Sequence, residues 1–78
     1  MSTPLLELVA SIMELDPSQV HEDSGMDSLP KWDSMRQLML ASMLESEFGF
    51  TLSAGELQNL QSVRKIRSIL AAHDVRDA

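Results

Sequence analysis

Apolar residues recur every three or four positions in three stretches of the chain, a period that predicts amphipathic α-helices. The first stretch begins at Thr3-Pro4, a capping residue followed by a proline that suits the first position of a helix. The second leads up to Gly49, a residue type that commonly ends helices. We therefore expect helices over about residues 4–15, 34–48 and 62–73.

A short fourth helix is expected over residues 54–59. Ser53 and Glu56 have the spacing of a capping box, in which each side chain accepts from the other residue's backbone N–H. No stretch has the strict alternation that predicts a β-strand. The pattern indicates an all-α domain over residues 1–78, a small four-helix bundle with three longer helices and one short one.

A long connection rich in Asp, Ser, Pro and Gly covers residues 16–33. Asp16-Pro17 is expected to stop the first helix, and Val20, Met26 and Leu29 are expected to anchor the connection to the bundle. A loop of this length in so small a domain is unusual and often functional.

The composition narrows the chemistry further. The chain has 78 residues, of which 44% are hydrophobic and 4% aromatic, as suits a small aliphatic helical core. It has no cysteine, so any thiol chemistry must come from an attached group. No basic, apolar leader or run of about 20 apolar residues is visible, so we expect no signal peptide or membrane span and a cytoplasmic location.

The formal net charge of −6 lies in the first half of the chain. Residues 1–33 carry seven acids and one base, whereas residues 34–78 carry five of each. This balance argues against nucleic acid as a partner. The acidic half either binds a basic protein partner or serves only to keep the protein soluble. Arg64, Lys65 and Arg67 on the last helix are too few for a nucleic-acid patch, and we expect them to face solvent.

Two serines lie in similar triplets, Asp27-Ser28-Leu29 and Asp33-Ser34-Met35. Pro30 disfavours a helix directly after the first triplet, whereas the second opens the longest predicted helix. Ser34 is therefore expected to be exposed near the positive end of a helix dipole, which suits an anion on its hydroxyl. Local pattern alone also allows the simpler role of a helix cap, filled by either Asp33 or Ser34.

From Trp32 to Leu52 the sequence resembles the central region of acyl carrier proteins and of their peptidyl and aminoacyl relatives. The matching elements are Asp33-Ser34-Met35, Leu44-Glu45, Phe48-Gly49 and Phe50-Thr51-Leu52. Family members place the glutamate eleven residues and the phenylalanine fourteen residues after the serine, and Glu45 and Phe48 lie at those distances from Ser34. Glu45 and Phe48 lie 17 and 20 residues after Ser28, so the family spacing does not fit that serine.

The resemblance implies a stand-alone monomeric carrier that is not itself an enzyme. Ser34 would receive 4′-phosphopantetheine from coenzyme A through a phosphopantetheinyl transferase, and the arm would hold cargo as a thioester. Asp33 would cap the helix and assist the transferase's metal, while the chain itself would bind none. A loading enzyme and a downstream synthase or transferase would be the other partners.

The helix after Ser34 is expected to be the recognition surface. The residues assigned to it are Met35, Arg36, Met39, Met43, Glu45 and Glu47. Carriers of bacterial fatty acid synthesis are acidic along this helix, whereas the three methionines here form one stripe at helical spacing. The stripe either faces the core or forms an adaptable contact surface. The departure favours a specialised pathway with dedicated partners.

The leading reading is an acyl carrier of a fatty acid, polyketide or other specialised pathway. An aminoacyl, peptidyl or D-alanyl carrier is the alternative within the class. A helical interaction module that is never modified is the alternative from another class. A serine hydrolase is disfavoured because His21 and His73 have no motif linking them to Ser34 and the core is too small for a pocket. A divalent-ion site at His21, Glu22 and Asp23 is also disfavoured, because their spacing matches no known metal-binding loop.

Overall fold

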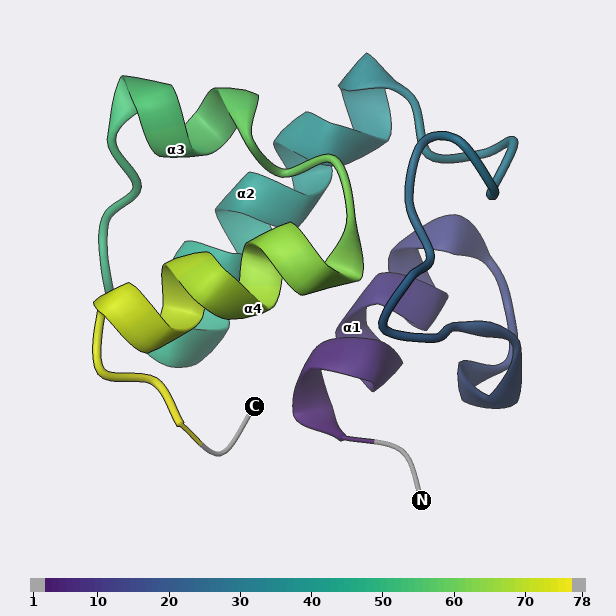
Figure 1. The fold of residues 1–78 in the computed structure, drawn as a ribbon, viewed down its shortest axis with the longest axis horizontal. Coiled ribbons are helices and arrows are strands. Elements are labelled where there is room, and N and C mark those ends of the chain that lie inside the picture. Colours follow the sequence, from purple (N-terminus) through teal and green to yellow (C-terminus); the bar gives the residue numbers. More distant parts are fainter. Residues whose placement is uncertain (1–2, 77–78) are drawn as a thin grey trace.

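The chain folds into a bundle of α-helices in a computed structural model that describes residues 3–76 (Figure 1). Within that range the α-helices are α1 (Pro4–Met13), α2 (Ser34–Phe48), α3 (Ala54–Gln58) and α4 (Val63–Ala72), with a 3₁₀ turn at Pro17–Gln19. The described residues form no strand, which confirms the expected all-helical bundle. None of their helices is long and apolar enough to cross a membrane.

Side-chain caps start each α-helix. The side chains of Thr3, Asp33 and Ser62 each accept from the N–H of the third residue of the helix that follows, in α1, α2 and α4 respectively. Ser53 forms the predicted capping box with Glu56 at the start of α3. These bonds satisfy N–H groups that have no acceptor inside the helix, and they explain why the helix starts were predictable.

The core is aliphatic and receives side chains from all three longer helices and from the connections between them. The fully buried large side chains are Leu5, Val9, Met13, Leu40, Leu44, Leu60, Val63, Ile66 and Leu70. Val20, Trp32 and Leu52 join them from connecting segments, and Leu29 and Phe48 pack against the cluster while half-buried. The bundle is therefore closed partly by its loops.

The first helix ends two residues earlier than the sequence pattern indicates. It stops at Met13 because Glu14 takes a left-handed conformation, with φ of 59°. The N–H of Leu15 then donates to the carbonyl of Ala10 at 2.8 Å, which closes the end of the helix. Asp16, expected to be the stop, instead caps the following 3₁₀ turn.

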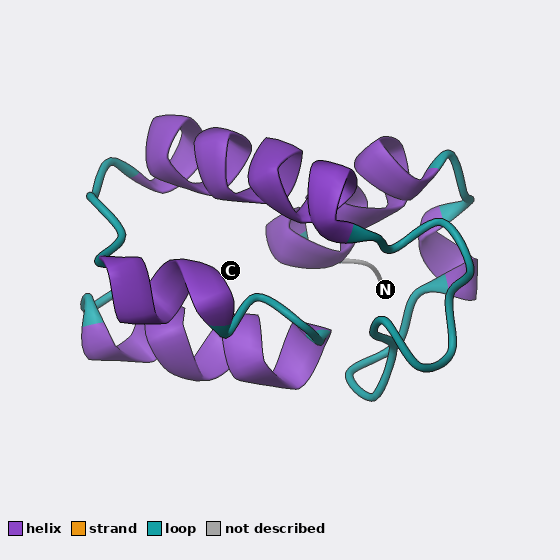
Figure 2. Cartoon of the chain, turned by 90° about the horizontal axis from the view of Figure 1, so that it is seen from above, coloured by secondary structure: helices purple, strands orange, loops and turns teal. Residues whose placement is uncertain are grey.

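The long connection lies against the start of α4 at one end of the molecule (Figures 1 and 2). The N–H of Met26 donates to the carbonyl of Gln61 at 3.0 Å, and the N–H of Val63 donates to that of Ser24 at 2.9 Å. This backbone pairing anchors the loop. The side chain of Met26 does not, because it is 38% exposed, so its predicted role as an apolar anchor was wrong.

Candidate functional site

Ser34 is the first residue of α2 and is exposed. The cap before it is Asp33, whose carboxylate accepts from the N–H of Arg36 at 2.9 Å. Within residues 3–76 the hydroxyl of Ser34 has no hydrogen-bond partner. The capping role that the sequence left open between these two residues thus belongs to Asp33, and the hydroxyl of Ser34 is available for chemistry.

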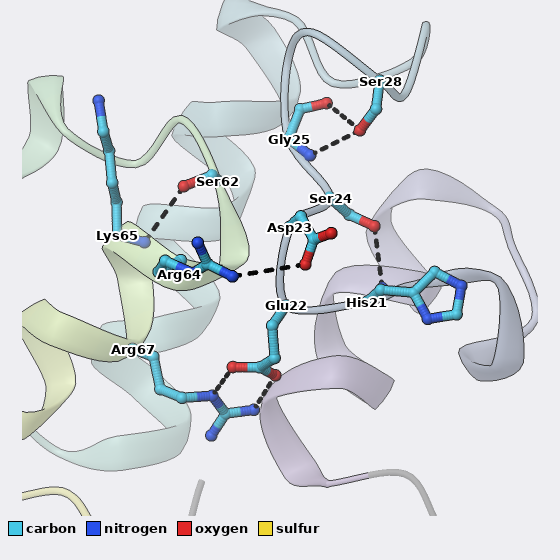
Figure 3. A network of polar contacts seen from close by, with 10 residues as sticks. All are labelled: His21, Glu22, Asp23, Ser24, Gly25, Ser28, Ser62, Arg64, Lys65 and Arg67. Carbon is cyan, nitrogen blue, oxygen red and sulfur yellow. Dashed lines mark hydrogen bonds and ion pairs between the residues drawn. The ribbon is translucent and has the colours of Figure 1, made fainter.

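Ser28 has a role inside its own turn. Its hydroxyl accepts from the N–H of Gly25 at 3.1 Å and approaches the carbonyl of the same residue at 3.4 Å (Figure 3). The N–H of Ser28 also donates to that carbonyl. The two similar triplets therefore differ in structure, since one serine closes a turn and the other opens a helix.

Trp32 fixes the chain just before the Asp33 cap. Its side chain is buried, and its Nε1–H donates to the carbonyl oxygen of Leu60 at 3.1 Å. Burial of the ring and this bond tie the entry to α2 to the α3–α4 connection. Trp32 is therefore a packing residue.

An ionic cluster joins the start of α2 to the end of α1. One carboxylate oxygen of Glu14 lies 3.1 Å from the Nζ of Lys31 and 3.1 Å from an Nη of Arg36. The Arg36 guanidinium also donates to the carbonyl of Ile12, in the last turn of α1. Lys31 and then Arg36 hold the pKa of Glu14 below its ordinary value.

The outward face of α2 carries four large apolar side chains together with the exposed Ser42 and Ser46. Met35, Leu38, Met39 and Met43 are 73%, 68%, 47% and 42% exposed. The three methionines are thus exposed rather than buried in the core, and Leu38 is an exposed apolar residue on the same helix that the sequence analysis did not assign. Its signal was the width of the apolar pattern, which exceeds one face of the helix.

The charged residues assigned to recognition behave differently from one another. Glu47 is exposed near the end of α2. Glu45 is half-buried, and its carboxylate accepts from the N–H of Leu52 at 2.8 Å, which fixes the turn after the helix. Arg36 is likewise turned inward to α1. Among the six residues assigned to recognition, those left exposed are therefore Met35, Met39, Met43 and Glu47.

Comparison with known proteins agrees with this geometry. Residues 3–70 match the family model described as a phosphopantetheine attachment site. The chain belongs to the acyl carrier protein family. It is 31% identical over 68 residues to polyketide-8 synthase acyl carrier protein 2 of Streptomyces avermitilis, a match that covers 87% of this chain and 78% of that protein. Acyl carrier proteins carry covalent 4′-phosphopantetheine and are not, in general, catalytic.

The histidines of this acyl carrier protein lie in structural contacts. The Nε2 of His73 is 2.9 Å from a carboxylate oxygen of Glu56, and its ring contacts that of Phe50. The N–H of His21 donates to the hydroxyl of Ser24 within the loop (Figure 3). Neither histidine makes a hydrogen bond to Ser34, so the arrangement that a hydrolytic serine needs is missing from residues 3–76.

The acids beside His21 pair with α4 of the acyl carrier protein. Glu22 lies 2.5 and 2.9 Å from two nitrogens of Arg67, and Asp23 lies 3.5 Å from Arg64 (Figure 3). No group of three potential metal-ligating side chains occurs in the described part of the chain. Arg67 is half-buried, so the expectation that this residue merely faces solvent was wrong.

Proposed function

We propose that Ser34 carries the 4′-phosphopantetheine arm, and that the chain presents acyl groups to partner enzymes of a fatty acid, polyketide or other specialised pathway. The observation that supports this proposal most directly is the exposed, unpaired hydroxyl of Ser34 at the start of α2. The spacing of Glu45 and Phe48 from Ser34 agrees with the family pattern.

The local chemistry suits the group. The arm supplies a flexible linker with a terminal thiol, which holds cargo as a thioester and which the cysteine-free chain cannot provide. The first N–H groups of α2 and its dipole favour a phosphodiester at Ser34. The carboxylate next to Ser34 is that of Asp33, which accepts from the N–H of Arg36, and no acidic residue follows Ser34 in the first turn of α2.

The partner surface in this proposal is the outward face of α2, formed by Met35, Leu38, Met39 and Met43 with Glu47 at its far end. This face begins beside Ser34, so an enzyme that reaches the arm must lie over it. Since the exposed side chains are mostly apolar, docking should depend more on apolar burial than on charge. Partners would be a phosphopantetheinyl transferase, a loading enzyme and a downstream synthase or transferase.

The first test is the intact mass of the purified protein before and after incubation with coenzyme A, magnesium and a broad-specificity phosphopantetheinyl transferase. Ser28→Ala is the matched control for Ser34→Ala. We expect wild type and Ser28→Ala to gain one phosphopantetheine and Ser34→Ala to gain none. Ser34→Ala should keep its stability, because Asp33 is the cap. Loading that fails only in Ser28→Ala would contradict the assignment.

The recognition face is tested with Leu38→Glu, using Ser68→Glu on the exposed side of α4 as the control. Leu38→Glu should raise the KM of the apo protein for the transferase, and Ser68→Glu should not. If Leu38→Glu and Ser68→Glu have equal KM values, the outward face of α2 is not the surface that the transferase binds.

Two alternatives have distinct outcomes. An aminoacyl, peptidyl or D-alanyl carrier would be loaded at Ser34 in the same way, but the mass of its cargo after isolation from the producing cells would differ. The relative's description as a polyketide synthase acyl carrier protein favours acyl cargo. An unmodified interaction module would gain no mass with any transferase while remaining folded.

A further inference from the structure

We propose that Glu14 is a positioning residue for Ser34. Its carboxylate holds the cationic side chains on either side of the serine, Lys31 and Arg36, and so presents the hydroxyl to the modifying enzyme in one orientation. The inference rests on the proposed role of Ser34 as the attachment site. It assigns a function to a residue at the end of α1, far in sequence from the serine.

The contacts define a clamp around the segment 31–36. The same Oε2 atom of Glu14 lies 3.1 Å from the Nζ of Lys31 and 3.1 Å from an Nη of Arg36. Arg36 has a second attachment at the carbonyl of Ile12. Both flanks of Ser34 are therefore tied to the end of one helix, with Lys31 three residues before the serine and Arg36 two residues after it.

The clamp also fixes which way Ser34 points. Residues two positions apart on an α-helix lie about 200° apart around its axis. Arg36 is held against α1, so Ser34 in the same turn must face away from α1. The structure agrees, because the side chain of Arg36 is 27% exposed whereas Ser34 is classed among the exposed residues.

The conformation of Glu14 adds to the case. It is one of two non-glycine residues with positive φ in the described chain, at 59°. Such a conformation is disfavoured for a residue with a side chain, and here the bond from the N–H of Leu15 to the carbonyl of Ala10 maintains it. Here it ends α1 and directs the carboxylate toward the two cations.

The expected effect is on capture of the carrier rather than on the chemical step. A transferase that binds an ordered segment spends less free energy on immobilising it than one that binds a mobile segment. Once bound, the transferase itself holds the serine. Loss of the clamp should therefore raise the KM for the apo protein and leave kcat nearly unchanged.

The experiment measures transfer from coenzyme A to apo wild type, Glu14→Gln and Asp74→Asn by a broad-specificity transferase. Asp74 is a close control, because it too has positive φ, follows the end of a helix and pairs with one arginine, Arg76, at 3.2 Å. We expect Glu14→Gln to raise KM by about two- to fivefold with kcat within a factor of about 1.5. Asp74→Asn should match wild type in both.

Two further readouts separate positioning from general stability. The KM gap between wild type and Glu14→Gln should narrow in about 1 M salt, which screens exposed ion pairs. Amide hydrogen exchange at Gln37 and Leu38, in the next part of α2, should be faster in Glu14→Gln. Lys31→Met provides a second variant with little risk to the fold, because Lys31 is half exposed, and it should raise KM by a smaller factor.

The outcomes are distinct. An unchanged KM in folded Glu14→Gln, or an equal rise in Asp74→Asn, would overturn the clamp. If Glu14→Gln fails to fold, an unchanged KM in Lys31→Met overturns it and a raised KM supports it. A wild type that accepts no phosphopantetheine would instead refute the proposed function, so the two failures are told apart.

Discussion

Gly25→Ala tests whether docking of the long loop onto α4 stabilises the fold. A Cβ added at Gly25 would lie 2.4 Å from the carbonyl oxygen of Gln61 and 2.9 Å from the Cβ of Ser62. The φ angle of Gly25 is outside the left-handed region, so alanine suits the backbone conformation. The steric contact is therefore the reason for glycine at this position, and the loop and α4 must separate to admit a methyl group.

The cost follows from what this separation disrupts. It weakens the bonds from Met26 N–H to Gln61 and from Val63 N–H to Ser24, each worth about 1 kcal/mol. Crowding adds about 1–3 kcal/mol where it is not relieved. We expect a loss of about 2–4 kcal/mol, a large part of the roughly 4–12 kcal/mol typical of a domain this size. The melting temperature should fall by roughly 10–25 °C.

The assay is urea and thermal unfolding followed by far-UV circular dichroism. Fluorescence of Trp32, the single tryptophan, provides a second probe near the same region. Gly55→Ala is the control, because nothing lies within 4 Å of its added Cβ and the residue is inside α3. That variant should be stabilised by up to about 1 kcal/mol. If Gly25→Ala unfolds at the same urea concentration and temperature as wild type, the steric reasoning is refuted.

Three other predictions concern single contacts. Asp33→Ala should lower the free energy of unfolding by about 1 kcal/mol through loss of the α2 cap, whereas Asp33→Asn should cost little in urea unfolding. Trp32→Phe should cost about 1–3 kcal/mol in the same assay, because a carbonyl in the α3–α4 connection loses its donor; an unchanged midpoint would contradict this bond. Hydrogen bonds from the Ser53 N–H and from His73 hold the pKa of Glu56 below its ordinary 4.5. Near this pH the folded state therefore binds fewer protons than the unfolded state, so the free energy of unfolding should fall as the pH drops below about 4.5. In melting temperatures recorded against pH, Glu56→Gln should show a smaller decrease over this range than wild type does.

The helix starts and the choice of serine could be predicted because their causes are local. Thr3-Pro4, the Ser53 capping box and the left-handed Gly49 each act within one turn of chain. The spacing from Ser34 to Glu45 is likewise a property of one helix. These features needed no knowledge of how the helices pack.

The parts that sequence reasoning missed depend on partners distant along the chain. Arg67 pairs with Glu22 across 45 residues, and no short-range pattern connects the two. The early end of α1 is a local exception, because a glutamate rather than a glycine takes the left-handed conformation that ends the helix. The position of Met26 outside the core could not be predicted from its hydrophobicity, because it depends on how the loop pairs with residues 61–63.

The pairing of residues 24–26 with residues 61–63 also sets an order of events during synthesis. Loop and partner are separated by more than 30 residues, so the loop cannot dock while the ribosome is still making α2 and α3. The caps of α1 and α2 form from neighbouring residues, whereas the loop can dock only after residues 61–63 have been made. A nascent chain therefore completes the surroundings of Gly25 only after residues 61–63 have been made, and until then the loop is open to proteases and chaperones.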